Sequence, residues 1–447
     1  MIRSIQNPQT RIGHEGIDYL CRKKFHCGIF ATVRGQNLTT SMPRETQRGK
    51  RHKAIMDEDT AAYETRTLLK AARAREKALL SLLRDLVELE SPSDEKKAVD
   101  RCLEYTAEAA TQLGARLRRH RNRGAGDVLE ARFGFEKSGR NAGKPILLLG
   151  HLDTVWPLGT LAGMPFKIEK GRAWGPGVLD MKAGVAMALT AIDLLQSEKL
   201  RRRLPHRPLT LLLVGDEETG SHASRAITEK IAGQCDRVYV LEPAQGLAGA
   251  YKTARKGVAT YHVHVDGVAA HSGVNFQDGH SAIAELARQV GKLESCTDLK
   301  RGITVNVGTI HGGTRSNVVA AEAWAEVDAR IARAADFPRL DRRLRNLRVQ
   351  DKGYVLKIDG GLNRPPMERT RATVALYRRA AALAAQMGFD LREAATGGGS
   401  DGNFTSALGV PTLDGMGAVG EGAHARNESV VLKDLAPRTA LLAALLM

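Results

Sequence analysis

Three short runs of this sequence are almost wholly apolar, and each is followed at once by acidic or histidine residues. The runs are PILLLG at 145–150, PLTLLLVG at 208–215 and RVYVL at 237–241. A strand without polar alternation is covered on both of its faces, and strands that alternate with helical segments indicate an α/β layer. We therefore expect an α/β fold whose chemistry lies in the loops beyond the carboxyl ends of these strands.

Helical patterns surround these runs. Residues 65–113 predict two helices joined at the sequence SPSDE, where Pro92 ends the first helix and Ser93 caps the second. The segment 180–197 is rich in Ala, Leu and Met and predicts a buried helix. A chain of 447 residues is too long for one ordinary core, so we expect two domains.

The hydrophobic pattern changes near the middle of the chain. Half-exposed strands and two helices follow one another there in the order β-α-β-β-α-β. This order is typical of the ferredoxin-like split βαβ unit. We therefore predict a small domain inserted at 255–365 between two parts of the main domain, 56–254 and 366–447. Within it, His262 and His264 lie on one face of an expected edge strand and are interpreted as structural.

The first 55 residues carry much of the positive charge. Residues 1–55 hold eleven lysines and arginines against three acidic residues, about half of the formal net charge of +17. The segment shows no helical period and no turn-bounded strands, so we expect it to be disordered or to precede a true start at Met56. The other basic stretches lack the interleaved aromatic residues of a nucleic-acid-binding surface. The charge therefore does not predict a nucleic-acid partner.

Composition also bears on the compartment. No apolar run is long enough to cross a bilayer, and the N-terminus lacks the apolar core of a secretory signal. The five cysteines are few, scattered and odd in number, which favours reduced thiols over a disulfide framework. We therefore expect a cytoplasmic protein with no membrane partner.

Seven acidic or histidine side chains follow the apolar strands or lie in comparable loops. Taken singly, each is unremarkable, since His-x-Asp pairs are common in loops and paired glutamates usually form a solvated face. Burying so many carboxylates near one another, however, would be costly without a cation. The seven residues are His151, Asp153, Asp180, Glu217, Glu218, Glu242 and His424.

The number and type of these residues suit a centre with two metal ions. Two histidines and three carboxylates fit the nitrogen and oxygen ligation of zinc-like ions. If one carboxylate bridges two ions, each ion has a histidine, a terminal carboxylate and the bridge, with room for a shared water. The remaining two carboxylates can then take the proton of the water and hold a histidine.

The same residues lie in motifs that follow one another in a specific order: GHLDTV, GPGVLDMKAG, DEETGS, LEP, AAHSG, SNVV, TGGGSDGN and GAHARNE. With these motifs the sequence resembles the M20 family of dinuclear zinc aminoacylases and carboxypeptidases, and most of all its glutamate carboxypeptidase (carboxypeptidase G2-like) branch. The resemblance spans about residues 65–447. It implies a zinc-peptidase-like catalytic domain, with a mixed sheet and helices on both faces, and an inserted dimerisation or lid domain.

The resemblance implies a role for each metal ligand. His151 and Glu242 would bind one zinc ion, and His424 and Glu218 would bind the other. Asp180 would bridge the two ions. Cobalt or manganese would suit the same ligands.

The resemblance also implies the residues that assist the metals. Glu217 would act as general base and then as general acid, and Asp153 would orient His151. The peptide bond between Asp180 and Met181 would be cis.

Substrate contacts follow from the same resemblance. His271 would reach into the active site of a partner subunit and stabilise the tetrahedral oxyanion, which implies a homodimer formed through the inserted domain. The other residues implied in substrate binding are Asn317, Arg330, Gly397, Gly398, Gly399 and Arg364. Of these, the glycines offer backbone N–H groups that a bulkier residue would block.

We therefore predict a hydrolase that cleaves the amide bond to a C-terminal, glutamate-like amino acid of a small N-acyl or peptidyl substrate. An N-acyl-amino-acid deacylase or a dipeptidase is an alternative, because the glycine loop and Arg330 suit any substrate with a free carboxylate. A non-catalytic metal-binding scaffold is a further alternative. It is disfavoured because every ligand position and the base are present.

Overall fold

The computed structural model describes residues 64–134, 143–197 and 207–447. The predicted disordered segment 1–55 and the predicted start at Met56 lie outside these ranges. Within them, no helix combines the length and the apolar character that crossing a bilayer requires.

The two helices predicted before the first apolar run are present. Helical residues 64–74 lead into α2 (Glu76–Glu88), and α3 (Lys96–Gln112) follows. The capping role predicted for Ser93 is wrong. The N-cap of α3 is Glu95, which makes no side-chain capping hydrogen bond, and the Ser93 hydroxyl is used elsewhere.

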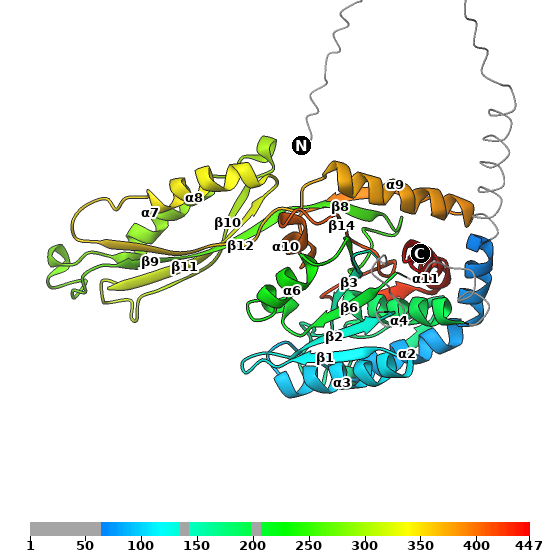
Figure 1. Cartoon of the computed structure of the whole chain (residues 1–447). Coiled ribbons are helices and arrows are strands. Elements are labelled where there is room, and N and C mark those ends of the chain that lie inside the picture. Colours follow the sequence, from blue (N-terminus) through cyan, green and yellow to red (C-terminus); the bar gives the residue numbers. More distant parts are fainter. Residues whose placement is uncertain (1–63, 135–142, 198–206) are drawn as a thin grey trace, which may run out of the picture. The chain divides into compact units, whose positions relative to one another are not determined.

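A six-stranded mixed sheet forms the centre of the chain outside the inserted segment (Figure 1). Its strands are β1 (Arg116–His120), β2 (Val128–Phe133), β3 (Ile146–His151), β6 (Leu209–Val214), β7 (Arg237–Val240) and β14 (Thr412–Leu413). They are ordered β1-β2-β6-β3-β7-β14. β3 is parallel to both β6 and β7, and β14 is parallel to β7, whereas the β1–β2 and β2–β6 pairs are antiparallel. The three predicted apolar runs are thus β3, β6 and β7.

Both faces of this sheet are covered, as predicted. Neighbouring side chains of a strand point to opposite faces, so Leu148 and Leu211 join one hydrophobic cluster while Leu147 and Leu212 join another. The first cluster also takes in α2, α3 and three further helices, and the second takes in α6. These helices are α4 (Ala183–Gln196), α9 (Arg371–Gln386), α11 (Leu432–Leu445) and α6 (Arg225–Ala232).

Two smaller sheets and a short helix complete the part of the chain outside the inserted segment. Their elements are β4 (Lys167–Glu169), β5 (Arg172–Trp174), β8 (Tyr251–Arg255), β13 (Glu393–Thr396), α10 (Gly402–Ala407), β15 (Gly420–Glu421) and β16 (Ser429–Val431). One sheet has the order β15-β16-β5-β4, and the other is the parallel pair β13-β8. The first sheet carries the loop with His424, and the second leads into the loop with Gly397.

The inserted segment has the predicted order of elements. They are β9 (Gly257–Asp266), α7 (Ala282–Glu294), β10 (Thr304–Gly312), β11 (Glu322–Ile331), α8 (Phe337–Arg345) and β12 (Val355–Arg364). The strands form an antiparallel sheet in the order β10-β11-β9-β12 with a hydrophobic cluster of its own. β9 therefore lies inside the sheet, and its prediction as an edge strand is wrong.

Short helical turns lie at Thr160–Ala162, Phe276–Asp278, Leu299–Arg301 and Ala334–Asp336.

Candidate metal centre

Three neighbouring strands bring predicted site residues to one edge of the central sheet. β3 ends at His151, β6 leads into the turn η4 (Glu217–Thr219), and Glu242 follows β7. β3 lies between β6 and β7 and is parallel to both, so their carboxyl ends meet at the same edge. The expectation that the ends of the apolar strands converge is therefore confirmed.

Asp180 and His424 come from segments outside the central sheet. Asp180 lies in the turn η3 (Val178–Lys182) before α4, and its peptide bond to Met181 is cis, as the resemblance implied. The carboxylate of Glu428 holds this turn by accepting hydrogen bonds from three backbone N–H groups. They belong to Gly177, Leu179 and Asp180. His424 lies between β15 and β16 with a φ of 62°, which is uncommon for a residue with a side chain.

The two histidines face different oxygens of Asp180. Nε2 of His151 lies 3.2 Å from Asp180 Oδ1, and Nε2 of His424 lies 3.4 Å from Asp180 Oδ2. Nε2 of His151 also lies 3.7 Å from Glu242 Oε1. Nε2 of His424 lies 3.1 Å from Glu218 Oε1. Ligand atoms of His151, Asp180 and Glu218 lie within 4.8 Å of one another, as do those of His151, Glu217 and Glu242, so these side chains could hold metal ions.

The electrostatics of the cluster also fit bound cations. Hydrogen bonds with Asp180 and Glu218 raise the pKa of His424 to about 10. Burial opposes protonation of His151, but its hydrogen-bonded carboxylates still raise its pKa well above the ordinary value. Burial and repulsion from Asp180 raise the pKa of Glu242 to about 8. Arg255 and Arg364 lie beside two of these buried carboxylates, and divalent cations would supply further positive charge to the cluster.

Asp153 is fully buried and supports the site in two ways. Its backbone carbonyl accepts a hydrogen bond from His151 Nδ1 at 2.9 Å, which leaves Nε2 to face a metal. Its carboxylate accepts hydrogen bonds from the backbone N–H groups of Glu217 and Glu218, each at 3.1 Å. The Ser93 hydroxyl donates to the same carboxylate at 2.7 Å. The geometry agrees with the orienting role that the resemblance implied for Asp153.

Glu217 faces the same edge of the sheet but is held by an arginine. Nη2 of Arg364 lies 2.8 Å from Glu217 Oε1 and also donates to Ser221 and to Asp401. Burial raises the pKa of Glu217 to about 7, although Arg364 acts in the opposite direction. Arg364, which was implied as a substrate contact, is therefore engaged by two carboxylates of its own chain.

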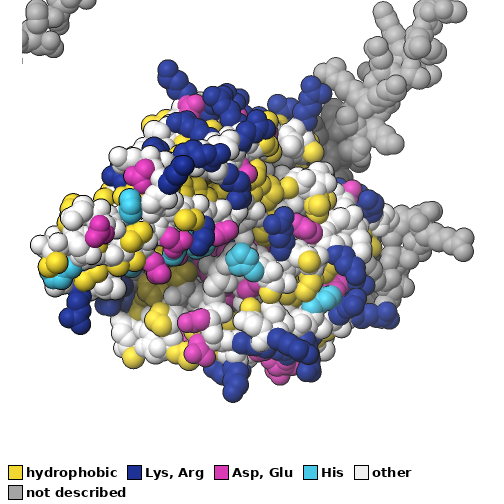
Figure 2. Space-filling model, turned by 90° about the vertical axis from the view of Figure 1, so that its left-hand side faces the viewer, with side chains coloured by type: hydrophobic (Ala, Val, Ile, Leu, Met, Phe, Trp, Pro, Cys, Tyr) yellow, Lys and Arg dark blue, Asp and Glu magenta, His cyan; other side chains and the backbone are white. Residues whose placement is uncertain are grey.

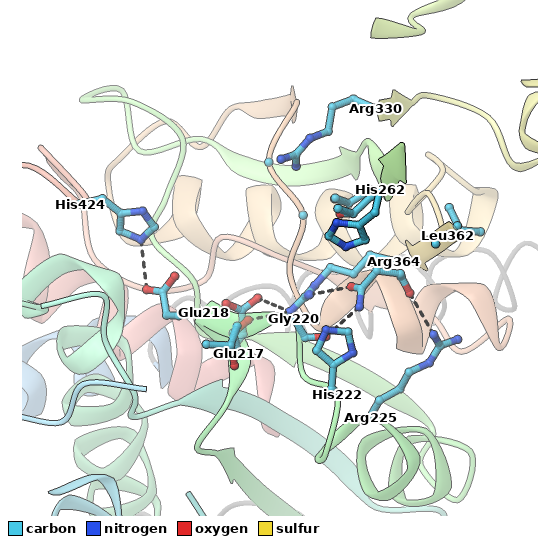
Figure 3. Close-up of a pocket in the computed structure, with 18 residues that line it drawn as sticks. Glu217, Glu218, Gly220, His222, Arg225, His262, Arg330, Leu362, Arg364 and His424 are labelled. Atoms are coloured by element: carbon cyan, nitrogen blue, oxygen red, sulfur yellow. Dashed lines mark hydrogen bonds and ion pairs between the residues drawn. The ribbon is translucent and has the colours of Figure 1, made fainter. Parts of the chain in front are cut away.

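A pocket of about 880 Å³ opens beside this cluster (Figure 3). Residues of the cluster, the glycine loop, the segment from Thr219 to Arg225 and one face of the inserted sheet form its wall. Histidine and acidic side chains gather around a hollow on the face of the molecule shown in Figure 2. The residues lining the pocket include Glu217, Glu218, His222, His262, Arg330, Arg364, Gly398, Gly399 and His424.

Within the pocket wall, Arg330 and His262 project from the inserted sheet. Arg330 is paired with Asp328 through two contacts of 2.8 Å. His262 was interpreted as structural, but its side chain is 59% exposed and lines the pocket. The alternation of β9 could have located it, because His262 shares the exposed face with Val258 and Thr260.

Three residues implied in substrate binding do not line this pocket. His271 and Asn317 lie exposed in the inserted domain, where the backbone of His271 pairs with that of Val318. Nδ1 of His271 accepts a hydrogen bond from the Gly273 N–H at 3.1 Å. Gly397 precedes the two glycines that do line the pocket.

Three supporting residues escaped the sequence interpretation. Glu428 ends the motif GAHARNE, so its place four residues after His424 was a usable signal. Ser93 and Arg255 offered none, because their partners are distant in sequence. Arg255 contacts Glu242 and the glycine loop.

The chain is similar to proteins of a known family and to known structures. Residues 147–447 match the model of Peptidase family M20/M25/M40. Carboxypeptidase G2 of Pseudomonas sp. (strain RS-16) is 28% identical over 387 residues, which cover 85% of this chain and 91% of that protein. The structure of aminopeptidase PepT from Bacillus cereus ATCC 10987 is similar with a TM-score of 0.68 at 23% identity, covering 83% of this chain and 98% of that one. The structure of an M20 family metallo-carboxypeptidase from Sulfolobus solfataricus is similar with a TM-score of 0.66 at 20% identity, covering 82% of this chain and 98% of that one.

Proposed function

Because this chain belongs to peptidase family M20/M25/M40, we propose that it is a two-metal hydrolase that releases a C-terminal amino acid from an N-acyl or peptidyl substrate. The observation that carries this proposal is the position of Asp180. Its two oxygens face two histidines, and each histidine also faces a glutamate of its own. This geometry suits a carboxylate that bridges two ions.

We propose zinc as the ion, with cobalt and manganese as substitutes that accept the same nitrogen and oxygen donors. His151 and Glu242 would hold one ion, His424 and Glu218 the other, and Asp180 both. When bound, the pair of ions would polarise the scissile carbonyl and lower the pKa of a water molecule.

Glu217 is the proposed general base. It takes the proton of the attacking water and passes it to the nitrogen of the leaving amino acid. Its raised pKa of about 7 supports this role, since a base works best near the pH at which the reaction runs. Asp153 holds the backbone of Glu217 and therefore the position of its carboxylate.

The proposed substrate has a free carboxylate beside the scissile bond. Arg330 and the N–H groups of the loop Gly397 to Gly399 would bind that carboxylate. We propose a glutamate-like residue for the released amino acid, because the pocket adds His222 and His262 to these groups and because carboxypeptidase G2 is among the relatives.

We further propose that two copies of the chain share their active sites. His271 and Asn317 are exposed and do not line the pocket of their own chain. A second chain, bound through the inserted domain, would place them beside its partner's metals. His271 would then stabilise the oxyanion of the tetrahedral intermediate.

The direct test is hydrolysis by the metal-loaded protein of a panel of N-acyl amino acids, dipeptides and N-acyl glutamates. We expect turnover with the highest kcat/KM for the glutamate substrates, and two bound ions per chain. A preference for dipeptides or for short N-acyl groups would replace the glutamate proposal with a dipeptidase or deacylase. Absence of both metal binding and hydrolysis would overturn the proposed function.

A further inference from the structure

Arg255 ends β8 and is 4% exposed. Its guanidinium donates hydrogen bonds to three separate parts of the chain. Nε and Nη2 bind the two oxygens of Asp414 at 2.8 and 2.7 Å. Nη2 also binds Glu242 at 3.2 Å, and Nη1 binds the carbonyl oxygens of Gly398 and Gly399 at 3.2 and 2.9 Å.

The two oxygens of the Glu242 carboxylate have different partners. Arg255 binds Oε2, while Oε1 lies 3.7 Å from Nε2 of His151, where the proposed ligands meet. Arg255 therefore leaves Glu242 with one oxygen directed at the metal position. Partners that bind the second atom of a metal ligand orient that ligand and tune its charge.

The contacts with the glycine loop orient its peptide groups. The peptide bond between Gly398 and Gly399 is trans, so its C=O and its N–H point in opposite directions. Since the Gly398 carbonyl points at Arg255, the Gly399 N–H points away from the guanidinium, and both glycines line the pocket. A Cβ at Gly399 would lie 2.9 Å from side-chain atoms of Arg364 and Val258, so this close approach requires glycine.

Asp414 keeps the guanidinium in this position. It is fully buried, and the Ser400 hydroxyl also donates to its Oδ2 at 2.6 Å. The paired contact with both oxygens of Asp414 fixes the plane of the guanidinium, which a lysine cannot reproduce.

We propose that Arg255 is a positioning residue. It holds the proposed metal ligand Glu242 and the proposed substrate-binding glycine loop in fixed positions relative to each other. Metal binding and carboxylate binding are then coupled through one side chain that contacts neither the ions nor the substrate. This inference rests on the proposed function and adds a residue to it.

The main test is Arg255→Lys in the full-length protein, which keeps the charge but loses the planar fork. We expect one of the two metal equivalents to bind ~10–100-fold more weakly, measured by calorimetric titration of the metal-free protein with Zn²⁺. We also expect KM for an N-acyl amino acid to rise more than kcat falls, because the glycine loop binds the carboxylate of the substrate. The visible absorption of the Co²⁺-loaded variant should change, because the geometry of one ion changes.

Arg438→Lys is the matched control. Arg438 is also buried, at 3% exposure, and donates to three backbone carbonyls, but it contacts no proposed metal ligand. A general effect of replacing a buried arginine would weaken metal binding in both variants. Our inference requires the loss in Arg255→Lys alone.

Asp414→Asn provides a second variant if Arg255→Lys does not fold. Arg255 then has Glu242 as its remaining charged partner and competes with the ion, so weaker metal binding is again expected. Wild-type metal affinity and wild-type KM in a folded Arg255→Lys or Asp414→Asn protein would overturn the inference and leave the proposed function intact. A wild-type protein without metal binding or hydrolysis would instead overturn the proposed function.

Discussion

The two halves of the proposed metal centre differ in burial and in support. In the buried half, the side chains of His151 and Glu242 are 1% and 9% exposed, and Asp153 and Arg255 hold them. In the open half, Glu218 is 9% exposed and its backbone is also held by Asp153, but His424 is 49% exposed and comes from a loop between two short strands. Ligands on sheet strands are positioned by the fold, whereas a loop ligand depends more on the ion itself. We therefore expect tighter binding of one ion in the buried half and easier loss of the other.

The largest effect is expected where the two halves meet. Asp180→Ala removes the carboxylate that both halves share, so both ions should be lost together and hydrolysis should fall to background. Metal analysis of the purified variant checks this expectation. Two retained ions would contradict the bridge, and one retained ion would show that the halves are independent.

Glu217→Gln tests the chemistry without changing either half. Glutamine keeps the shape of the side chain but cannot take a proton, so kcat should fall by ~10²–10⁴-fold. Both ions should remain bound, because Glu217 is not one of the proposed ligands. Unchanged turnover in a variant with two bound ions would remove Glu217 from the mechanism.

Replacing one histidine in each half sharpens the comparison directly. His424→Ala should weaken the binding of one ion and lower the stability of the metal-free protein less than His151→Ala does, because the side chain is half exposed and solvent screens its ion pairs with Asp180 and Glu218. His151→Ala should weaken the binding of one ion. It should also lower the melting temperature, because it leaves a buried cavity and removes the imidazole that faces the buried carboxylates. Equal effects of the two substitutions on stability would contradict the difference between the halves.

The stability of the metal-free protein should fall as pH rises from about 5 to 8. Burial raises the pKa of Glu217 to about 7 and that of Glu242 to about 8, from the ordinary 4.5. The folded chain therefore holds protons that the unfolded chain releases, and this contribution is complete below pH 4.5 and lost as pH rises through 7 to 8. His424 adds to this trend above pH 6.5, its ordinary pKa, because its pKa in the folded chain is raised to about 10.

Urea unfolding at several pH values measures this trend, and Glu242→Gln should flatten it. Saturating Zn²⁺ should reverse it, because metal ligands bind in their deprotonated form. If the stability of the metal-free protein rises with pH, the raised pKa values of Glu217, Glu242 and His424 are contradicted.

The smallest effect is expected at the support of the buried half. Ser93→Ala removes one hydrogen bond to the Asp153 carboxylate and should cost about 1 kcal/mol in the free energy of unfolding. Ser295→Ala is a suitable control, since its hydroxyl also makes hydrogen bonds, to the Lys292 carbonyl and from Arg343, but at an exposed position. An equal loss of stability in both variants would deny Ser93 a special role.

Much of the fold was predictable because its causes are local. The apolar runs of β3, β6 and β7 and the alternation of β9 and β11 follow from burial on two faces or on one. The error at β9 has a different origin. A half-exposed strand has the same pattern at an edge and inside an antiparallel sheet, so the pattern predicts the faces but not the neighbours.

The ligand types were also predictable, since several acidic and histidine residues placed directly after buried strands would repel or remain unpaired without a cation. Their supports were not. Ser93 is predicted from its neighbours to cap a helix, yet its hydroxyl binds Asp153, 60 residues away. Arg255 has the sequence context of an ordinary strand residue, yet it binds Asp414, 159 residues away.

The sequence by itself determined the apolar strands, the longer helices, the order of elements in the inserted segment and the chemical types at the site, because those depend on neighbouring residues and on burial. Only the tertiary structure decided which oxygen of Asp180 faces which histidine, that Arg364 holds Glu217, and that Arg255 joins Glu242 to the glycine loop. Such contacts join segments far apart in the chain. A hydrogen bond depends on distance and direction in space, which sequence spacing does not specify.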